Sequence, residues 1–388
     1  MWRKKAMGGG GGGNGNVISS SKNNFLLFSL VLIATALLTL CFSSFPSSSS
    51  SSSSASFFSP LHLTNHKRSS SSSSNFPVYS HLLHPYLETW NNQTEFVYQL
   101  PETPPKAVLF LAHGCSCKAT FFWDKAPGCT SCIGLPEDRA LVLGAIEKSF
   151  AVIAISSLGV CWSQEYDADS TREVLLSWIA RKGLVGLPLF GLGASSGGYF
   201  LSVFANSVDF NAIVVMIAEG RFQEVAAMPE DDASPSYPPP VLFVHMPRDR
   251  IRAARIVKTM AMLKSAGIDA DECKCMKMQI TRTFFSQRIP YIDEDLSRQI
   301  QDFLNQSGFL DNRGFLKRDG RDTGFEDAMK EKQNRNLLLT LSAKNDEWEH
   351  HIREELNVAY AFHEFTSLPS TQIFSWFDSH MSISAKLS

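Results

Sequence analysis

The first 87 residues of this 388-residue chain contain no aspartate or glutamate, and Glu88 is the first acidic residue. An acid-free, serine-rich start is typical of a targeting sequence or of a membrane anchor with a linker. Over the whole chain the formal net charge is only −2, so no excess of basic residues argues for a nucleic-acid partner. No internal repeat is present, and the length fits one large domain with appendages.

No charged residue interrupts residues 25–42, which read FLLFSLVLIATALLTLCF. Eighteen such residues are close to the minimum for a helix that crosses a bilayer, and longer than most signal-peptide cores. Basic residues precede the segment without any acidic one, so the positive-inside tendency leaves the N-terminus in the cytosol. We therefore predict a disordered cytosolic N-terminus (1–24), a single-pass transmembrane anchor (25–42) and a Ser-rich disordered linker (43–77).

This orientation places the remaining domain, residues 78–388, in the lumen of the secretory pathway or outside the cell. A cleaved signal peptide and a plastid transit peptide are the alternatives. Two Asn-x-Ser/Thr triplets begin at Asn92 and Asn305 and would be usable only in that lumen. Such triplets are common by chance, so they add little support.

Short apolar runs alternate with helical patterns through the rest of the chain. Continuous Val/Ile/Leu/Phe runs are typical of parallel strands that are covered on both faces. Such runs occupy 106–114, 150–157, 187–198, 211–220 and 239–249, and a further strand is predicted at 272–280. Helical spacing occurs at 169–182, 196–206 and 251–266. This order predicts an α/β fold with a doubly wound, mostly parallel sheet.

Residues 193–197 read GASSG, a G-x-S-x-G segment between a predicted strand and a predicted helix. A serine hydroxyl is a poor nucleophile unless a sharp turn exposes it beside a base. The turn is strained and brings helix and strand close together, so the neighbours of the serine must be small. The pattern predicts Ser195 as a nucleophile; the alternative is a glycine-rich turn that only packs.

On these residues the chain from about residue 95 onward resembles the α/β-hydrolase superfamily, in a plant-like, membrane-anchored form. The resemblance implies a Ser-His-Asp triad without cofactor or metal, and an oxyanion hole made by two backbone N–H groups. One donor would be Ser196, and the other Cys115, because His113-Gly114 directly follows a predicted strand. His113 itself is predicted to be structural, since this fold normally uses a later histidine as the base.

The acid implied by the resemblance is Asp249, which follows the predicted strand at 239–249 in a strand-His-x-x-x-Asp pattern with His245. The alternative role for Asp249 is to cap the N-terminus of the next helix. Glu219, after the preceding strand, is the reserve candidate for the acid.

The base departs from the family pattern, because no histidine follows Asp249 until His350. His350 and His351 lie in a charged helical stretch and are predicted to face solvent. His363 lies just before a last predicted helix and completes the order Ser, Asp, His, so we predict it as the base.

This departure leaves a helical, lid-like insertion at 281–355 before the last catalytic element. Its apolar side chains either line an acyl pocket or form the core of the insertion itself. The residues concerned are Phe284, Phe285, Ile289, Phe303, Leu304 and Phe309.

The eight cysteines include a C-x-C and a C-x-x-C pair, formed by Cys115, Cys117, Cys129 and Cys132. Four thiolates could hold zinc, but a lumenal location favours one or two disulfides that stiffen the oxyanion loop. Three further cysteines are expected to be core or edge residues: Cys161, Cys273 and Cys275.

Together these features predict a serine hydrolase of the carboxylesterase or lipase type, which cleaves an ester or similar acyl bond in a small, lipid-like molecule. The alternative is a catalytically inactive protein of the same fold, tethered to a membrane as a binding or interaction protein; the displaced histidine supports it. Thiol redox chemistry at Cys129-x-x-Cys132 is a weaker third hypothesis.

Overall fold

The computed structural model describes residues 83–91, 93–222 and 238–382. The predicted cytosolic N-terminus, transmembrane anchor and linker, residues 1–77, lie outside the described residues and stay predictions. Within the described ranges, no helix is both long and apolar enough to cross a membrane.

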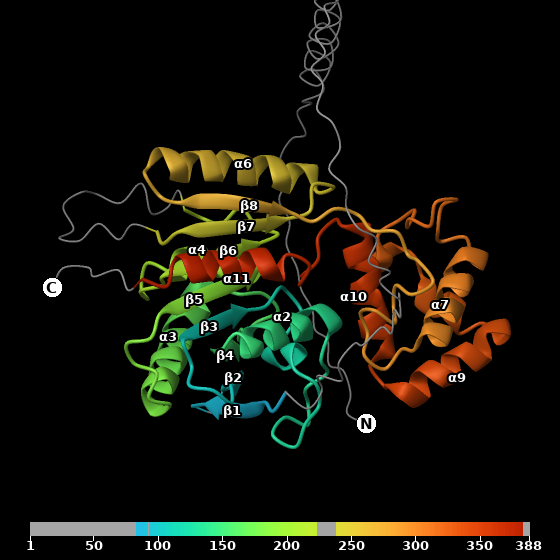
Figure 1. Cartoon of the computed structure of the whole chain (residues 1–388), viewed down its shortest axis with the longest axis horizontal. Coiled ribbons are helices and arrows are strands. Elements are labelled where there is room, and N and C mark those ends of the chain that lie inside the picture. The colour runs from blue at the N-terminus through green and yellow to red at the C-terminus, as the bar shows by residue number, and fades with distance from the viewer. Residues whose placement is uncertain (1–82, 92, 223–237, 383–388) are drawn as a thin grey trace, which may run out of the picture. The chain divides into compact units, whose positions relative to one another are not determined.

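An eight-stranded sheet forms the centre of the domain, in the order β1-β2-β4-β3-β5-β6-β7-β8 (Figure 1). β1 and β2 pair antiparallel, as do β2 and β4, and all later pairs are parallel. The strands are β1 Tyr86–Trp90, β2 Thr94–Gln99, β3 Ala107–Ala112, β4 Phe150–Ile155, β5 Leu189–Ala194, β6 Ala212–Met216, β7 Val241–His245 and β8 Ala270–Lys274. This is the strand order of the α/β-hydrolase fold, and the predicted fold class is confirmed.

Helices cover both faces of the sheet because its central strands are apolar on both sides. Along β3, Val108 and Phe110 point to one face while Leu109 and Leu111 point to the other. The first face packs against α3 (Gln164–Arg181), α4 (Ser196–Phe204) and α6 (Arg250–Ser265), and the second against α2 (Pro136–Glu147) and α11 (Ser370–Ser379).

A helical segment lies between β8 and α11 in the chain, at one side of the sheet (Figure 1). It contains α7 (Glu294–Gln306), α8 (Phe325–Met329), α9 (Arg335–Lys344) and α10 (Trp348–Tyr360). These helices enclose a hydrophobic core of their own. A lid function for this segment stays a prediction.

The apolar residues of the insertion pack inward rather than lining a pocket. Phe284, Phe285, Ile289, Phe303 and Leu304 are buried in this separate core, and Phe309 packs against it. These side chains therefore form a core of the insertion itself, which is the second of the two interpretations made from the sequence.

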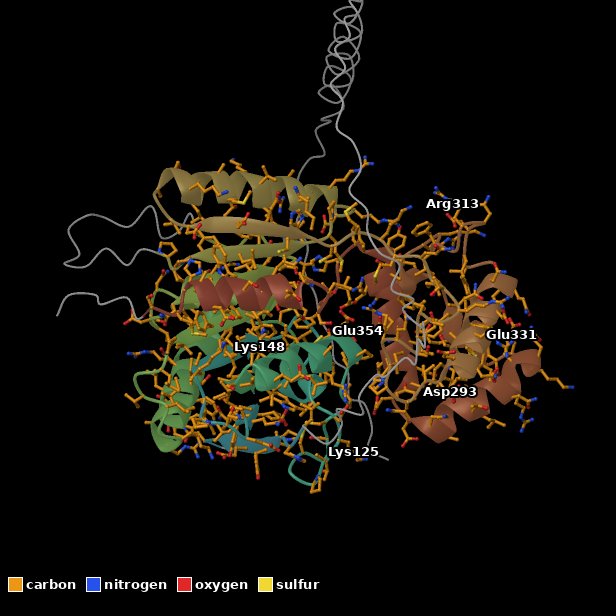
Figure 2. All side chains as sticks on the ribbon, viewed as in Figure 1. Lys125, Lys148, Asp293, Arg313, Glu331 and Glu354 are labelled. Carbon is orange, nitrogen blue, oxygen red and sulfur yellow. A yellow bond between two sulfur atoms is a disulfide. The ribbon has the colours of Figure 1, made fainter. Side chains whose placement is uncertain are left out.

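Buried charged groups join this segment to the sheet domain where α10 meets α2 (Figure 2). Arg288 contacts Glu137 at 2.5 Å and also pairs with Glu355. The carboxylate of Glu354 accepts the backbone N–H of Glu137 at 2.9 Å. Burial raises the pKa of Glu355 to about 8, so this carboxyl group holds a proton more readily than an exposed one.

The separate core predicts that Phe285→Ala lowers the free energy of unfolding by about 3–5 kcal/mol, because it empties a fully buried aromatic site. Leu339→Ala, at a position that is 56% exposed in the same segment, should change it by about 0.5 kcal/mol or less. Urea unfolding of the full chain measures both. Equal stability of the two variants would contradict the assignment of Phe285 to a core.

Candidate active site

Ser195 lies at a sharp turn between the end of β5 and the start of α4. Its backbone adopts φ 52° and ψ −113°, a conformation that non-glycine residues rarely hold. The Ser195 N–H donates to the carbonyl of Met216, at the end of the neighbouring strand β6, at 2.9 Å. The turn therefore places the serine side chain at the carboxyl ends of the parallel strands.

Glycines allow this turn to sit close to the neighbouring backbone. A Cβ atom at Gly193 would lie 2.3 Å from the carbonyl oxygen of Gly197. A Cβ atom at Gly197 would lie 2.3 Å from the carbonyl oxygen of Ala112, at the end of β3. Only glycine fits either position without a backbone shift.

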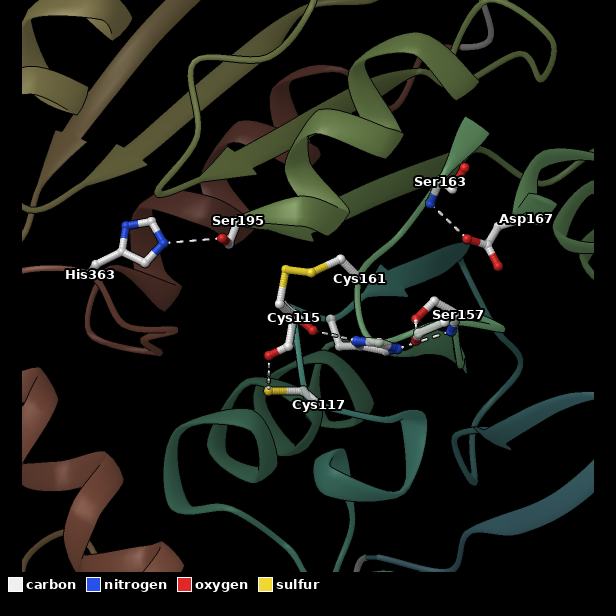
Figure 3. The surroundings of a disulfide bond; sticks show 11 residues. Cys115, Cys117, Ser157, Cys161, Ser163, Asp167, Ser195 and His363 are labelled. Atoms are coloured by element: carbon white, nitrogen blue, oxygen red, sulfur yellow. Dashed lines mark hydrogen bonds between the residues drawn. A yellow bond between two sulfur atoms is a disulfide. The ribbon is translucent and has the colours of Figure 1, made fainter. Parts of the chain in front are cut away.

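The imidazole of His363 reaches the hydroxyl of Ser195 from a loop that follows α10 (Figure 3). Its Nε2 lies 3.1 Å from Ser195 Oγ. Its Nδ1 lies 3.5 Å from Asp249 Oδ2, a long contact of the kind found before a ligand tightens a site. The structure thus brings together the three side chains that the sequence singled out.

Asp249 lies between the N-terminus of α6 and the imidazole of His363. Its Oδ1 accepts the backbone N–H of Arg252 at 3.0 Å and so caps the N-terminus of α6, while Oδ2 faces His363. The cap fixes the position of the carboxylate, because it is held by the first turn of a helix.

The environment lowers the pKa of His363 below its usual value of 6.5. Burial is the main cause, and the positive charges of Arg252 and Arg321 add to it. The carboxylate of Asp249 acts in the opposite direction. An imidazole with a lowered pKa is neutral near pH 7 and can accept a proton at Nε2.

The proposed oxyanion donors lie in two segments next to Ser195. A Cβ atom at Gly114 would stand 3.8 Å from the Cβ of Ser195, so the loop that leads to Cys115 runs beside the serine. Ser196 is the first residue of α4, where a backbone N–H has no partner within the helix. In the described part of the chain neither the Cys115 nor the Ser196 N–H donates to a protein acceptor.

A disulfide between Cys115 and Cys161 ties this loop to the loop after β4 (Figure 3). The Ser116 N–H also donates to the carbonyl of Val160 at 2.7 Å. The prediction of Cys161 as a core or edge residue is therefore wrong. β3 and β4 are adjacent and parallel, so their following loops meet although the two cysteines are 46 residues apart.

The other predicted disulfide cysteines divide into a pair and a free thiol. Cys129 and Cys132 are bonded to each other. Cys117 is free, so its prediction as a disulfide residue is wrong; burial raises the pKa of its thiol to about 12. No group of three or more metal-ligating side chains gathers among the described residues.

His113 has a structural place beneath the oxyanion loop. Its Nδ1–H donates to the carbonyl of Gly114 at 2.7 Å, and its Nε2 accepts the N–H of Ser157 at 3.1 Å. Burial lowers the pKa of His113 to about 4, which keeps the ring neutral. These bonds hold the loop rather than a reacting group, as the sequence predicts.

Glu219, the reserve acid, belongs to a different cluster. It accepts from the hydroxyl of Tyr199 at 2.5 Å and from the guanidinium of Arg252 at 2.5 Å. Its partners are therefore these two side chains and Arg255, not His363. The sequence patterns did not single out Arg252. The only sequence feature that points to it is its position three residues after Asp249, a predicted helix cap.

The two histidines of α10 differ from each other. His350 is exposed and contacts Glu347 at 2.8 Å, as predicted for a solvent-facing residue. His351 is buried and lies 2.9 Å from the carbonyl of Ile133, so the prediction that it faces solvent is wrong. The charged residues around His351 suggested an exposed helix, but α10 packs on α2.

Comparison with models of protein families and with curated proteins found no match. Solved structures are similar at low identity. A carboxyl esterase from Bacillus coagulans is 11% identical with a TM-score of 0.36, over 58% of this chain and 99% of that chain. An alpha/beta hydrolase from a deep-sea metagenome of the Medee basin is 12% identical with a TM-score of 0.37, over 57% and 96%.

A third similar structure is an a/b serine hydrolase without lid from Xanthomonas campestris. It is 13% identical with a TM-score of 0.33, over 55% of this chain and 88% of that chain. Similarities at this level carry no weight for function. The strand order of the sheet identifies the α/β-hydrolase fold.

The tight turn predicts that Gly197→Ala destabilises the domain by about 1–3 kcal/mol or more, because the new methyl group would meet the carbonyls of Ala112 and His113. Gly159→Ala is the matched control, since the nearest atom to its Cβ is 3.5 Å away. Urea unfolding compares the two. A Gly197→Ala protein as stable as the control would show that the turn is looser than described.

Proposed function

We propose that this protein is a serine hydrolase that cleaves an ester or similar acyl bond, with Ser195 as nucleophile, His363 as base and Asp249 as its partner. The observation that carries the proposal is the 3.1 Å contact between Ser195 Oγ and His363 Nε2, which joins residues 168 positions apart. The strained turn at Ser195 supports it, because strain of this kind persists where function needs an exposed hydroxyl.

In the proposed reaction, Ser195 Oγ attacks the substrate carbonyl while His363 Nε2 takes the hydroxyl proton. Asp249 holds the Nδ1–H and stabilises the charged imidazolium. The N–H groups of Cys115 and Ser196 stabilise the oxyanion, each contributing about 3–4 kcal/mol in the transition state. His363 then returns the proton to the leaving group, and water releases the acyl group by the reverse path.

The proposed substrate is a small acyl ester of lipid-like character, as expected of a carboxylesterase or lipase on a membrane tether. The proposed location is the lumen of the secretory pathway or the cell exterior. Two disulfides among the described residues support an oxidising compartment. Asn305, the first residue of the second triplet, is exposed in the last turn of α7.

A fluorophosphonate probe tests the nucleophile directly. Wild-type protein should be labelled, and Ser195→Ala should not, because the probe reacts with an activated serine hydroxyl. His363→Gln and Asp249→Asn should lower ester hydrolysis on the order of 10⁴-fold or more. His350→Gln, at an exposed histidine outside the site, should retain labelling and hydrolysis.

Absence of labelling in the wild type, or labelling that persists in Ser195→Ala, would reject the proposed function. Absence of labelling would favour the inactive, membrane-tethered binding protein instead.

The lowered pKa of His363 predicts the pH dependence of hydrolysis. The base must be neutral to accept the serine proton, so kcat/KM should rise with pH through the pKa of His363 and then level off. Because burial and Arg252 lower this pKa, the midpoint should lie below pH 6.5. A pH–rate profile with a midpoint above pH 7 would contradict this environment.

A further inference from the structure

Two side chains of the helical segment, Arg321 and Asn357, hold the loop that carries His363. The Nδ2 of Asn357 donates to the carboxylate of Glu364 at 2.7 Å. Arg321 lies in a short 3₁₀ helix, η3 (Gly320–Asp322), between α7 and α8. Its Nη2 donates to the backbone carbonyl of His363 at 2.6 Å and to the carboxylate of Glu364 at 2.5 Å. One guanidinium therefore contacts the proposed base residue and its neighbour together.

The guanidinium is itself fixed in place. Its Nη1 donates to both carboxylate oxygens of Asp319 at 3.2 Å, and Asp319 also accepts the Arg321 backbone N–H at 3.0 Å. η3 lies against α10, since a Cβ atom at Gly320 would be 2.4 Å from the side-chain oxygen of Asn357. A guanidinium group that is itself held by hydrogen bonds restricts the positions of its partners more than a freely rotating side chain does.

The far end of the same loop is held from the sheet domain. The carboxylate of Glu137, in α2, accepts the N–H of Ser367 at 2.6 Å and the hydroxyl of Thr366 at 2.9 Å. These contacts fix the loop three or four residues beyond the imidazole. At His363 itself, Arg321 holds the backbone from the helical segment.

We propose that Arg321 is a positioning residue: by binding the His363 carbonyl, it keeps the imidazole aligned between Ser195 and Asp249. This role in catalysis rests on the proposed function. Through Arg321, the helical segment helps to align the proposed base with Ser195 and Asp249.

The charged groups that face His363 come from two elements. Asp249 and Arg252 lie at the start of α6, and Arg321 lies in η3. The positive charge of Arg321 contributes to the lowered pKa of His363, so its removal should raise that pKa. Glu364 is partly buried, which raises its pKa, and it pairs with Arg321, so it also loses a partner when the arginine is removed.

The experiment compares Arg321→Ala, Arg321→Lys and Arg321→Gln in the full chain, with p-nitrophenyl butyrate as the substrate. Arg353→Ala is the matched control, because Arg353 pairs with Glu326 in the same segment and its side chain is 37% exposed, against 41% for Arg321. Thermal unfolding of all variants measures the purely structural cost of losing an ion pair.

Arg321→Ala should lower kcat by about 10- to 100-fold while KM changes about twofold or less, since misplacing a catalytic group by about 1 Å costs rates of this order. Arg321→Lys should recover part of the loss, because one donor and the charge remain. Arg353→Ala should stay within about twofold of the wild type in kcat. Equal kcat values for Arg321→Ala and Arg353→Ala would overturn the proposal.

The pH profile separates positioning from a simple loss of stability. The acidic limb should move to higher pH in Arg321→Ala and Arg321→Gln, which lack the charge, but not in Arg321→Lys or Arg353→Ala. A limb that moves in none of the Arg321 variants would mean that the arginine does not face the imidazole.

A measurement that needs no turnover keeps the two proposals apart. Diethyl pyrocarbonate modifies neutral imidazole, and mass spectrometry follows its rate at His363 against pH; the side chain is 26% exposed and so can be reached. A higher midpoint in Arg321→Ala than in the wild type supports the contact even if the protein hydrolyses nothing. An unchanged midpoint overturns the inference, whether or not Ser195 is active.

Discussion

The close approach of β5 and α4 to the end of β3 is the constraint on which the candidate site depends. Gly193 and Gly197 let the backbone at this turn come within a distance that no Cβ atom would allow. Ser195 adopts a positive-φ conformation at this turn, the loop after β3 runs beside it, and the loop after β7 carries Asp249, which contacts His363.

His363, the proposed base, does not follow a strand of the sheet directly, unlike Ser195 and Asp249. Its loop follows α10 and is held by Glu137 from α2 on one side and by Arg321 from η3 on the other. Glu137 is buried, where hydrogen bonds to a charged group are strong and the loss of one partner is costly, whereas the side chain of Arg321 is 41% exposed. The alignment of His363 therefore depends on how the helical segment docks on the sheet domain.

Sequence patterns predicted the parts of the molecule that are decided locally. The continuous apolar strands β3 to β7 and the glycine-rich turn at Ser195 follow from residue types over a few positions. β1 and β2 were missed: β1 is largely exposed and has no apolar run, and β2, although mostly buried, has polar residues at both ends of a short segment, TEFVYQ. The Cys115–Cys161 bond and the contact of Arg321 with His363 were also missed, since each joins segments that only the tertiary fold brings together.

The distance in sequence between Asp249 and His363 counts little against the proposed triad. The entropic cost of closing a loop rises by only about 0.6 kcal/mol for each doubling of its length, so a connection of over a hundred residues costs about 1 kcal/mol more than one of about thirty. The intervening chain also folds around a core of its own, which shortens the effective connection. The long sequence separation of His363 from Asp249 is therefore weak support for an inactive protein. The contacts of the His363 imidazole with Ser195 and Asp249 are the stronger criterion for activity.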